Sequence, residues 1–190
     1  MTALSRSADI HRLPQPLRRT IIGYFQGITP FTFISHPDTL RLCHAALVVA
    51  QFLAIHFKMS FKRPRPSQLH PGLLPPIDVP QHASYPSAHA TEAWLVALCL
   101  DEVVVDGGGN KIMQTTHPGP PLVTRNALHD MATRIARNRE VLGVHYKSDS
   151  AAGKLLAEQA FDIMKTCPTA AGLITAAKTH WQNISQTTTP

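Results

Sequence analysis

The segment 88–105 constrains the fold most, because it is apolar on most of its sides. In a helix of about 3.6 residues per turn, consecutive apolar residues point in every direction around the axis. Such a helix is stable only when other elements surround it. The segment therefore predicts a helical bundle in which it occupies the centre, with an apolar surface formed by Ala93, Trp94, Leu95, Val96, Leu98 and Leu100.

The rest of the chain predicts further helices and no convincing strand. Helical spacing of apolar residues indicates helices over residues 38–58, 121–137, 145–167 and 169–181, with a shorter one at 17–26. Between them, the proline-rich stretch 63–86 excludes a helix and a central strand. The glycine- and proline-rich stretch 106–121 is typical of a surface loop. The predicted class is all-α.

Length and charge favour one domain that binds anions. The 190 residues suffice for a single domain, residues 1–190, in which 1–16 and 183–190 are expected to be loosely ordered tails. Lys and Arg total 18 against 12 for Asp and Glu, and the formal charge of +6 favours anionic ligands. No nucleic-acid motif or aromatic stacking platform accompanies these charges. We therefore expect a small oxyanion ligand and no nucleic-acid partner.

Cysteine usage and hydropathy indicate a soluble, cytoplasmic protein. Cys43, Cys99 and Cys167 are widely spaced and form no pairing or metal-binding pattern, which suits a reducing compartment. No apolar stretch follows the basic N-terminal residues, so no secretion signal is expected. The longest apolar run, about residues 45–57, is shorter than the roughly 20 residues that cross a bilayer. No membrane span is expected.

Three short blocks carry the residues with chemical potential. The first has Lys58, six residues, and then Arg65 followed by a proline. The second is the pentapeptide that ends Pro-Ser-Ala-His, with Ser87, Ala88 and His89. The third has Arg139, five residues, His145, three residues and Asp149.

Local geometry brings anion-binding groups together in the first two blocks. Lys58 is expected at the C-terminus of a helix, and Arg65 in an extended segment, because the residue before a proline avoids helical geometry. Ser87 stands where a proline-rich loop becomes a helix, which is a natural N-cap position. Its hydroxyl and the N–H groups of Ala88 and His89 then lie at a helix N-terminus, where anions bind.

The third block adds a histidine with a free ring nitrogen. His145 and Asp149 are four residues apart, so on a helix they face the same way. Asp149, or a nearby backbone carbonyl, could hold one ring nitrogen of His145 and leave the other free to attack. Arg139 is expected just before that helix, where its guanidinium could grip two oxygens. Three cations suit a dianionic, trigonal-bipyramidal transition state better than a neutral carbonyl.

The three blocks resemble the motifs of the superfamily that joins vanadium-dependent haloperoxidases with type 2 phosphatidic acid phosphatases and bacterial class A acid phosphatases. The resemblance implies the all-α bundle of that superfamily. It implies that Lys58, Arg65 and Arg139 bind the equatorial oxygens with help from Ser87. His145 would become phosphohistidine in a phosphatase, or be the axial ligand of vanadate in a haloperoxidase. His89 would be the general acid and then the general base, and Asp149 would orient His145.

Two residues depart from the superfamily pattern. Ala88 replaces the usual glycine, and its methyl group would crowd the pocket unless φ is negative there. Asn138 replaces the usual serine beside Arg139. Neither substitution removes a catalytic group, although Ala88 leaves open an inactive relative that only binds oxyanions.

Phosphatase and haloperoxidase remain alternatives, because both chemistries use the same residues around the oxyanion. The short chain favours a phosphomonoesterase that needs no metal or other cofactor. His82, seven residues before His89, resembles the arrangement in algal bromoperoxidases, where it would tune peroxide or halide chemistry on vanadate; the alternative is an ordinary loop histidine. The balance favours the phosphatase. Helical relatives commonly pair, so a homodimer is a candidate assembly.

Overall fold

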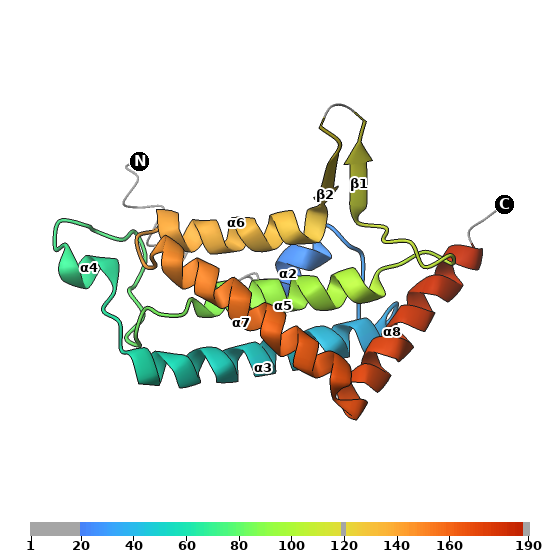
Figure 1. Ribbon diagram of the computed structural model, residues 1–190, viewed down its shortest axis with the longest axis horizontal. Coiled ribbons are helices and arrows are strands. Elements are labelled where there is room, and N and C mark those ends of the chain that lie inside the picture. Colours follow the sequence, from blue (N-terminus) through green and yellow to red (C-terminus); the bar gives the residue numbers. More distant parts are fainter. Residues whose placement is uncertain (1–19, 119–120, 188–190) are drawn as a thin grey trace.

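The computed structural model describes residues 20–118 and 121–187 and forms a helical bundle (Figure 1). Helix α5 (Ala88–Val103) runs through its centre, and the helices α3 (Pro37–Phe61), α6 (Ala127–Val141) and α7 (Lys147–Thr166) pack around it. Most residues of α5 are buried, and Leu95 has no exposed surface. The predicted all-α bundle with this helix at its centre is therefore confirmed.

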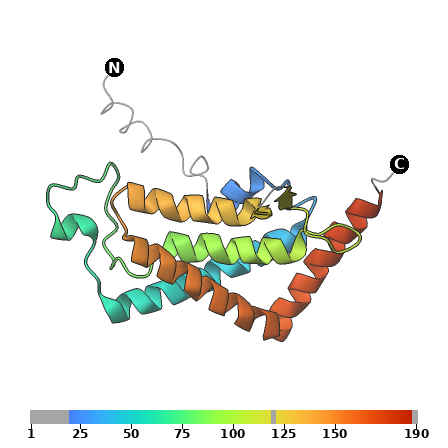
Figure 2. The same ribbon diagram turned by 45° about the horizontal axis from the view of Figure 1, so that its top comes forward.

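The two terminal helices cover other parts of the bundle. Helix α2 (Ile21–Gln26) contacts α5 and α6, whereas α8 (Pro168–Thr187) folds back at an angle to α7 and crosses one end (Figure 2). The indole of Trp181 donates to Thr39 Oγ1 at 3.0 Å and ties α8 to α3. Helix α8 continues to Thr187, so residues 183–187 are helical where a loosely ordered tail was expected, and residues 188–190 lie outside the described residues. The expected tail 1–16 lies outside the described residues.

A β-hairpin projects from the bundle where a loop and the start of a helix were expected. Strands β1 (Gln114–His117) and β2 (Val123–Asn126) pair antiparallel. Helix α6 begins only after β2, because the side chain of Asn126 caps it by accepting from the N–H groups of Leu128 and His129. The prediction of a helix from residue 121 was therefore wrong at its start.

The proline-rich stretch contains one helical turn that the sequence was expected to exclude. Helix α4 (Pro66–Leu69) begins with Pro66 at its first position, where the missing N–H is not needed. The remainder of residues 63–86 is irregular, as expected. This segment follows α3 and leads into α5, so it lies beside the N-terminal end of the central helix (Figure 1).

Helix α3 is longer and more exposed than expected. Within the described residues, the segment Pro37–Leu69 meets the length and composition of a membrane span, and 28% of its most apolar window is buried. Val48, Phe52 and Met59 are exposed on it. The expectation that no segment is long enough rested on the run 45–57 alone and does not hold. One helix of this length and composition does not by itself establish a span.

Candidate active site

The carboxylate of Asp149 holds together one side of the site. This side chain is fully buried in the first turn of α7. It accepts hydrogen bonds from His145 Nδ1 at 3.0 Å, from the backbone N–H of Tyr146 at 3.0 Å, and from the Ser84 hydroxyl. Arg63 forms an ion pair with it, with 2.8 Å between the guanidinium and Oδ1. Burial acts to raise the pKa of Asp149, but the hydrogen bonds from His145, Ser84 and Tyr146 outweigh it and hold the pKa below its usual value.

His145 does not lie on a helix, which corrects the expectation from the sequence. It stands in the turn between α6 and α7, and α7 begins only after the cap residue Tyr146. Gly143 allows this turn, with φ at +69°, a value that favours glycine. The spacing of His145 and Asp149 still brings them into contact, because Asp149 caps the helix and reaches back to the turn.

The hydrogen bond to Asp149 determines which nitrogen of His145 is free. If Nδ1 carries the proton that it donates to Asp149, Nε2 holds a lone pair. Nε2 faces the Arg65 guanidinium at 3.3 Å. Burial and the charge of Arg65 lower the pKa of His145 to about 4, against the opposing effect of Asp149. His145 is therefore neutral near pH 7, as a nucleophile must be.

Backbone carbonyl groups fix Arg65. It lies in an extended conformation before α4, and its side chain is only 1% exposed. Its Nε donates to the carbonyls of Pro80 at 2.9 Å and His82 at 3.1 Å, and a terminal nitrogen donates to Val144 at 2.6 Å. Burial, followed by the charge of Arg139, lowers its pKa to about 10.

Lys58 is held in a similar way from the last turn of α3. Its ammonium donates to the carbonyls of Ala83 at 2.8 Å and Ser84 at 3.0 Å. The side chain is buried, and burial, followed by the charge of Arg65, lowers its pKa to about 8. The position at a helix C-terminus was expected, but Lys58 lines a neighbouring cavity and not the one that contains His145.

The start of α5 has the predicted geometry. Ser87 is the N-cap, and its hydroxyl accepts from the N–H of Ala90 at 3.4 Å. Its own N–H donates to the carbonyl of Asp149 at 3.0 Å, which joins α5 to α7. Ala88 is the first helical residue, and among the described non-glycine residues only Lys62 has a positive φ. The alanine therefore causes no backbone strain at this position.

His89 and Arg139 form the opposite side of the site. His89 extends from the first turn of α5 and part of its surface is exposed. The protein around the ring still displaces water from it, and this desolvation, followed by the charge of Arg139, lowers its pKa to about 4. Arg139 is half-buried in the last turn of α6 and so precedes His145, as expected. Within residues 20–118 and 121–187, its buried Nε has no hydrogen-bond partner.

A cavity of about 300 Å³ brings most of the predicted residues together. It is lined by Arg65, His82, Ala88, His89, Arg139 and His145, with Gln51, Ile55, Pro80 and Glu92. Asp149 lies behind His145 and does not line the cavity. The terminal guanidinium nitrogen of Arg65 is 3.2 Å from His82 Nδ1, so His82 lies at the cavity wall beside a predicted anion-binding group.

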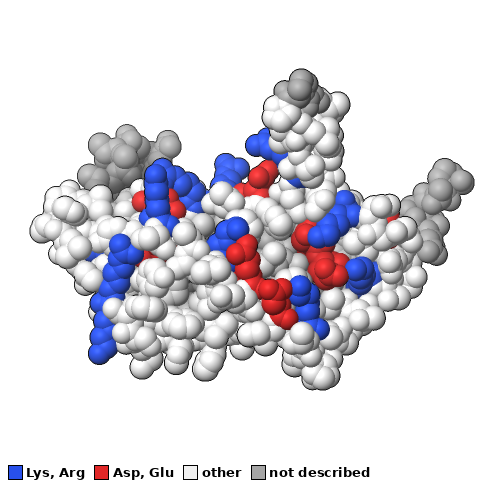
Figure 3. Space-filling view, viewed as in Figure 1, with Lys and Arg blue, Asp and Glu red and all other residues white. Residues whose placement is uncertain are grey.

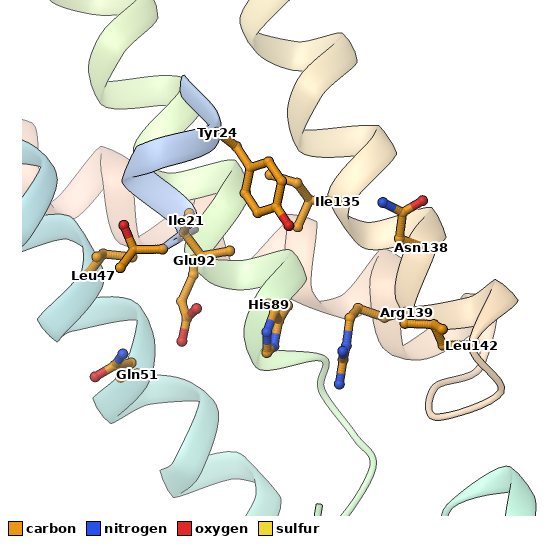
Figure 4. Close-up of a pocket in the computed structure, with 11 residues that line it drawn as sticks. Ile21, Tyr24, Leu47, Gln51, His89, Glu92, Ile135, Asn138, Arg139 and Leu142 are labelled. Atoms are coloured by element: carbon orange, nitrogen blue, oxygen red, sulfur yellow. The ribbon is translucent and has the colours of Figure 1, made fainter. Parts of the chain in front are cut away.

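Sequence analysis missed three residues of this region. Arg63 and Ser84 bind Asp149, and Glu92 lines the cavity one helical turn after His89 (Figure 4). Arg63 was visible only as part of a basic cluster, and Ser84 precedes the second block. Outside the cavity, Lys and Arg are interspersed with Asp and Glu on the face shown in Figure 3, with no continuous basic surface there.

The chain matches the PAP2 superfamily over residues 39–171. The chain belongs to this superfamily. The match includes all three blocks and the helices that position them, from α3 to the start of α8. The PAP2 resemblance of the motifs and the helical fold are thus confirmed together.

The curated relatives of the chain include both phosphatases and a haloperoxidase. The chain is 32% identical over 112 residues to the decaprenylphosphoryl-5-phosphoribose phosphatase of Mycobacterium tuberculosis, covering 59% of this chain and 51% of that protein. The Mycolicibacterium smegmatis protein of the same name is 33% identical over 112 residues, 59% of this chain and 47% of that protein. A vanadium-dependent bromoperoxidase of Ascophyllum nodosum is 32% identical over 91 residues, 42% of this chain and 16% of that protein. The chain thus spans about half of each phosphatase and far less of the bromoperoxidase.

Proposed function

We propose that this PAP2 protein is a phosphomonoesterase that works without a metal ion, through a phosphohistidine at His145. One observation carries the proposal: Asp149 binds Nδ1 of His145, so that Nε2 faces a cavity where Arg65 and Arg139 converge. A neutral imidazole oriented by a carboxylate is an activated nucleophile. Two guanidinium groups beside it are suited to bind the oxygens of a phosphoryl group.

The proposed reaction has two steps. Nε2 of His145 attacks phosphorus, a P–N bond forms, and the P–O bond to the alcohol breaks while His89 gives its proton to the departing oxygen. A water molecule then attacks phosphorus, His89 takes its proton, and the P–N bond breaks to release phosphate. His89 must carry a proton for the first step. A bound phosphate dianion would raise its low pKa by opposing the charge of Arg139.

The relatives support hydrolysis of a phosphate ester. Two of them are named as phosphatases of decaprenylphosphoryl-5-phosphoribose, and they match a larger share of this chain than the bromoperoxidase does. The matched share of each phosphatase is about half, so the substrate of this chain is a separate question.

A vanadium-dependent haloperoxidase is the second candidate, because His82 contacts Arg65 at the cavity wall. The donor set fits vanadate: His145 would hold it through its free ring nitrogen, and Arg65 and Arg139 would bind its oxygens. Bound vanadate would supply a centre that activates hydrogen peroxide for halide oxidation. His82 would then hydrogen-bond or tune that centre through Arg65.

Two assays on the purified protein distinguish these functions. The first measures phosphate release from p-nitrophenyl phosphate, and the second measures bromination of a dye by peroxide after loading with vanadate. We expect phosphate release that vanadate inhibits competitively and that His145→Ala abolishes. Protein quenched with alkaline detergent should contain a phosphoryl group that is stable in base and lost in acid, which is the behaviour of phosphohistidine.

Other results would point elsewhere. Bromination that needs vanadate and falls in His82→Ala, without phosphate release, would favour the haloperoxidase. No phosphate release and no bromination, together with retained vanadate binding, would indicate an inactive oxyanion-binding relative. Ser67→Ala, a substitution in α4 away from the cavity lining, provides a matched control that should behave as wild type in both assays.

A further inference from the structure

A second cavity of about 440 Å³ adjoins the one that contains His145 (Figure 4). The two cavities share the side chains of His89, Glu92, Arg139 and Gln51. The second cavity lies among α2, α3, α5 and α6, and its lining does not include Arg65 or His145. It therefore begins at the residues opposite the proposed nucleophile.

In-line displacement directs the alcohol portion of a substrate toward this second cavity. The attacking and leaving oxygen or nitrogen atoms lie on opposite sides of phosphorus in phosphoryl transfer. With His145 on one side, the leaving oxygen must lie near His89, which protonates it in the proposed mechanism. The space beyond His89 and Arg139 is this cavity.

The lining of the second cavity is apolar with a few polar groups, as ligand sites commonly are. Ile21, Leu47 and Ile135 form apolar wall. Tyr24 adds a phenol hydroxyl from α2, and Glu92 adds a carboxyl group from α5. An alcohol with both carbon atoms and hydrogen-bonding groups suits such a lining.

Glu92 is unusual because it is buried without a cation of its own. Its side chain is 9% exposed, and among the described residues it forms no ion pair with a basic side chain. Burial raises the pKa of Glu92 to about 7, with Gln51 and the charge of Arg139 opposing that rise. A buried carboxyl group without a paired charge costs stability. No ion pair within the described residues compensates for this loss of stability.

The charges around Glu92 indicate which kind of ligand group it can bind. Arg139, whose charge acts on Glu92, and Arg65, which lines the first cavity with it, make the region positive, and this disfavours an ammonium group on the ligand. A carboxyl group that is partly protonated near neutral pH both donates and accepts hydrogen bonds, which matches a hydroxyl group. Building on the proposed phosphatase function, we infer that Glu92 is a specificity-determining residue that hydrogen-bonds a hydroxyl group on the alcohol portion of the substrate.

The test compares two phosphate esters of equal length, glycerol 3-phosphate and n-propyl phosphate. In the wild-type protein, we expect kcat/KM to be about tenfold or more higher for glycerol 3-phosphate, which is the usual effect of one hydrogen bond to a buried group. Glu92→Met should remove most of this preference, and Glu92→Gln should retain part of it. Glu102→Met, on the same helix but ion-paired to Lys178 outside both cavities, should keep the preference.

Calorimetric binding of the same two esters separates this inference from the proposed reaction. If neither ester is hydrolysed but glycerol 3-phosphate binds more tightly and Glu92→Met removes the difference, the phosphatase proposal fails and the inference stands. Equal treatment of the two esters by the wild-type protein would overturn the inference. Equal losses for both esters in Glu92→Met, with weaker binding of inorganic phosphate, would also overturn it and assign Glu92 to holding Arg139.

Discussion

The two sides of the candidate active site are built differently. On the side of Asp149, the functional groups of Arg65, Lys58 and His145 are buried, and each has a hydrogen bond to a carbonyl group or a carboxylate. On the side of His89, the ring is exposed and Arg139 Nε lacks a partner among the described residues. Folding alone therefore holds the functional groups on the Asp149 side in place.

This difference indicates that a bound ligand is needed to fix the groups on the His89 side. Burial lowers the pKa values of Lys58 and Arg65, to about 8 and about 10, and the charges of neighbouring arginines contribute to this lowering. A dianion in the cavity would relieve this repulsion. It would also give Arg139 Nε the partner that it lacks among the described residues. We therefore expect substitutions on the Asp149 side to reduce stability and activity together, and those on the His89 side to reduce activity alone.

The largest expected effect belongs to Asp149→Asn. The amide cannot accept from Arg63 and His145 as the carboxylate does, so the partly exposed guanidinium of Arg63 loses its buried counter-charge and His145 loses its orientation. We expect kcat to fall by about 10³–10⁴-fold and the free energy of unfolding by about 3 kcal/mol. Steady-state kinetics and urea unfolding measure both.

The matched control for this variant is Asp162→Asn. Asp162 lies on the same helix, is exposed and pairs with Lys165. A surface ion pair contributes about 0–1 kcal/mol, so kcat and stability should both stay close to wild type. If Asp149→Asn is as mild as this control, the Asp149 network does not order the site.

A paired substitution tests the comparison directly. Arg65→Met removes the donor to the carbonyl groups of Pro80, His82 and Val144, the last of them buried, and we expect a loss of about 2–4 kcal/mol in unfolding free energy. Arg139→Met removes an incompletely bonded cation, and we expect a change within about 1 kcal/mol. Both should lower kcat/KM by about 10²–10³-fold. Equal effects on stability would remove the distinction between the two sides.

The sequence predicted the positions that local patterns determine. Arg65 precedes a proline and is extended, Ser87 caps α5, and the apolar segment beginning at Ala88 is central. Each of these features depends on residues next to one another in the chain. The residue types and spacing within the three blocks, which are also local patterns, were sufficient to identify the superfamily and most of the cavity lining.

Features that join distant segments were not predictable in this way. Arg63 and Ser84 reach Asp149 across 86 and 65 residues, and no local pattern marks such contacts. His145 was placed on a helix because the spacing to Asp149 suits one. The structure uses Asp149 to cap the Tyr146 N–H, so the helix begins after His145. The prolines before residue 122 suggested a helix start, whereas Asn126 provides the cap.

Lys58 should limit activity at alkaline pH. Its pKa of about 8 means that it loses its charge as the pH rises through that value, and anion binding should weaken. The phosphate ester itself is fully ionised there, because its second pKa is about 6. Above pH 8, we expect kcat/KM to fall by about tenfold for each further pH unit.

The control for this pH dependence is Lys58→Met. That variant should be weakly active at neutral pH and should show no further loss above pH 8. Glu92, whose pKa is about 7, lines the cavity that contains His145, so Glu92→Gln should be profiled as well. A loss above pH 8 that persists in Lys58→Met would assign the titration to another group.

The smallest expected effect is that of Ser84→Ala. Its buried hydroxyl donates to Asp149, which keeps three other hydrogen-bond donors when the hydroxyl is removed. We expect a loss of about 1 kcal/mol in unfolding free energy and a decrease of about three- to tenfold in kcat, because His145 would be held less firmly but would keep its tautomer. Ser148→Ala, which removes only a partner of Arg63 at the surface, is the control. A loss in Ser84→Ala as large as that of Asp149→Asn would mean that Ser84, at 3.5 Å from His145 Nδ1, itself orients the nucleophile.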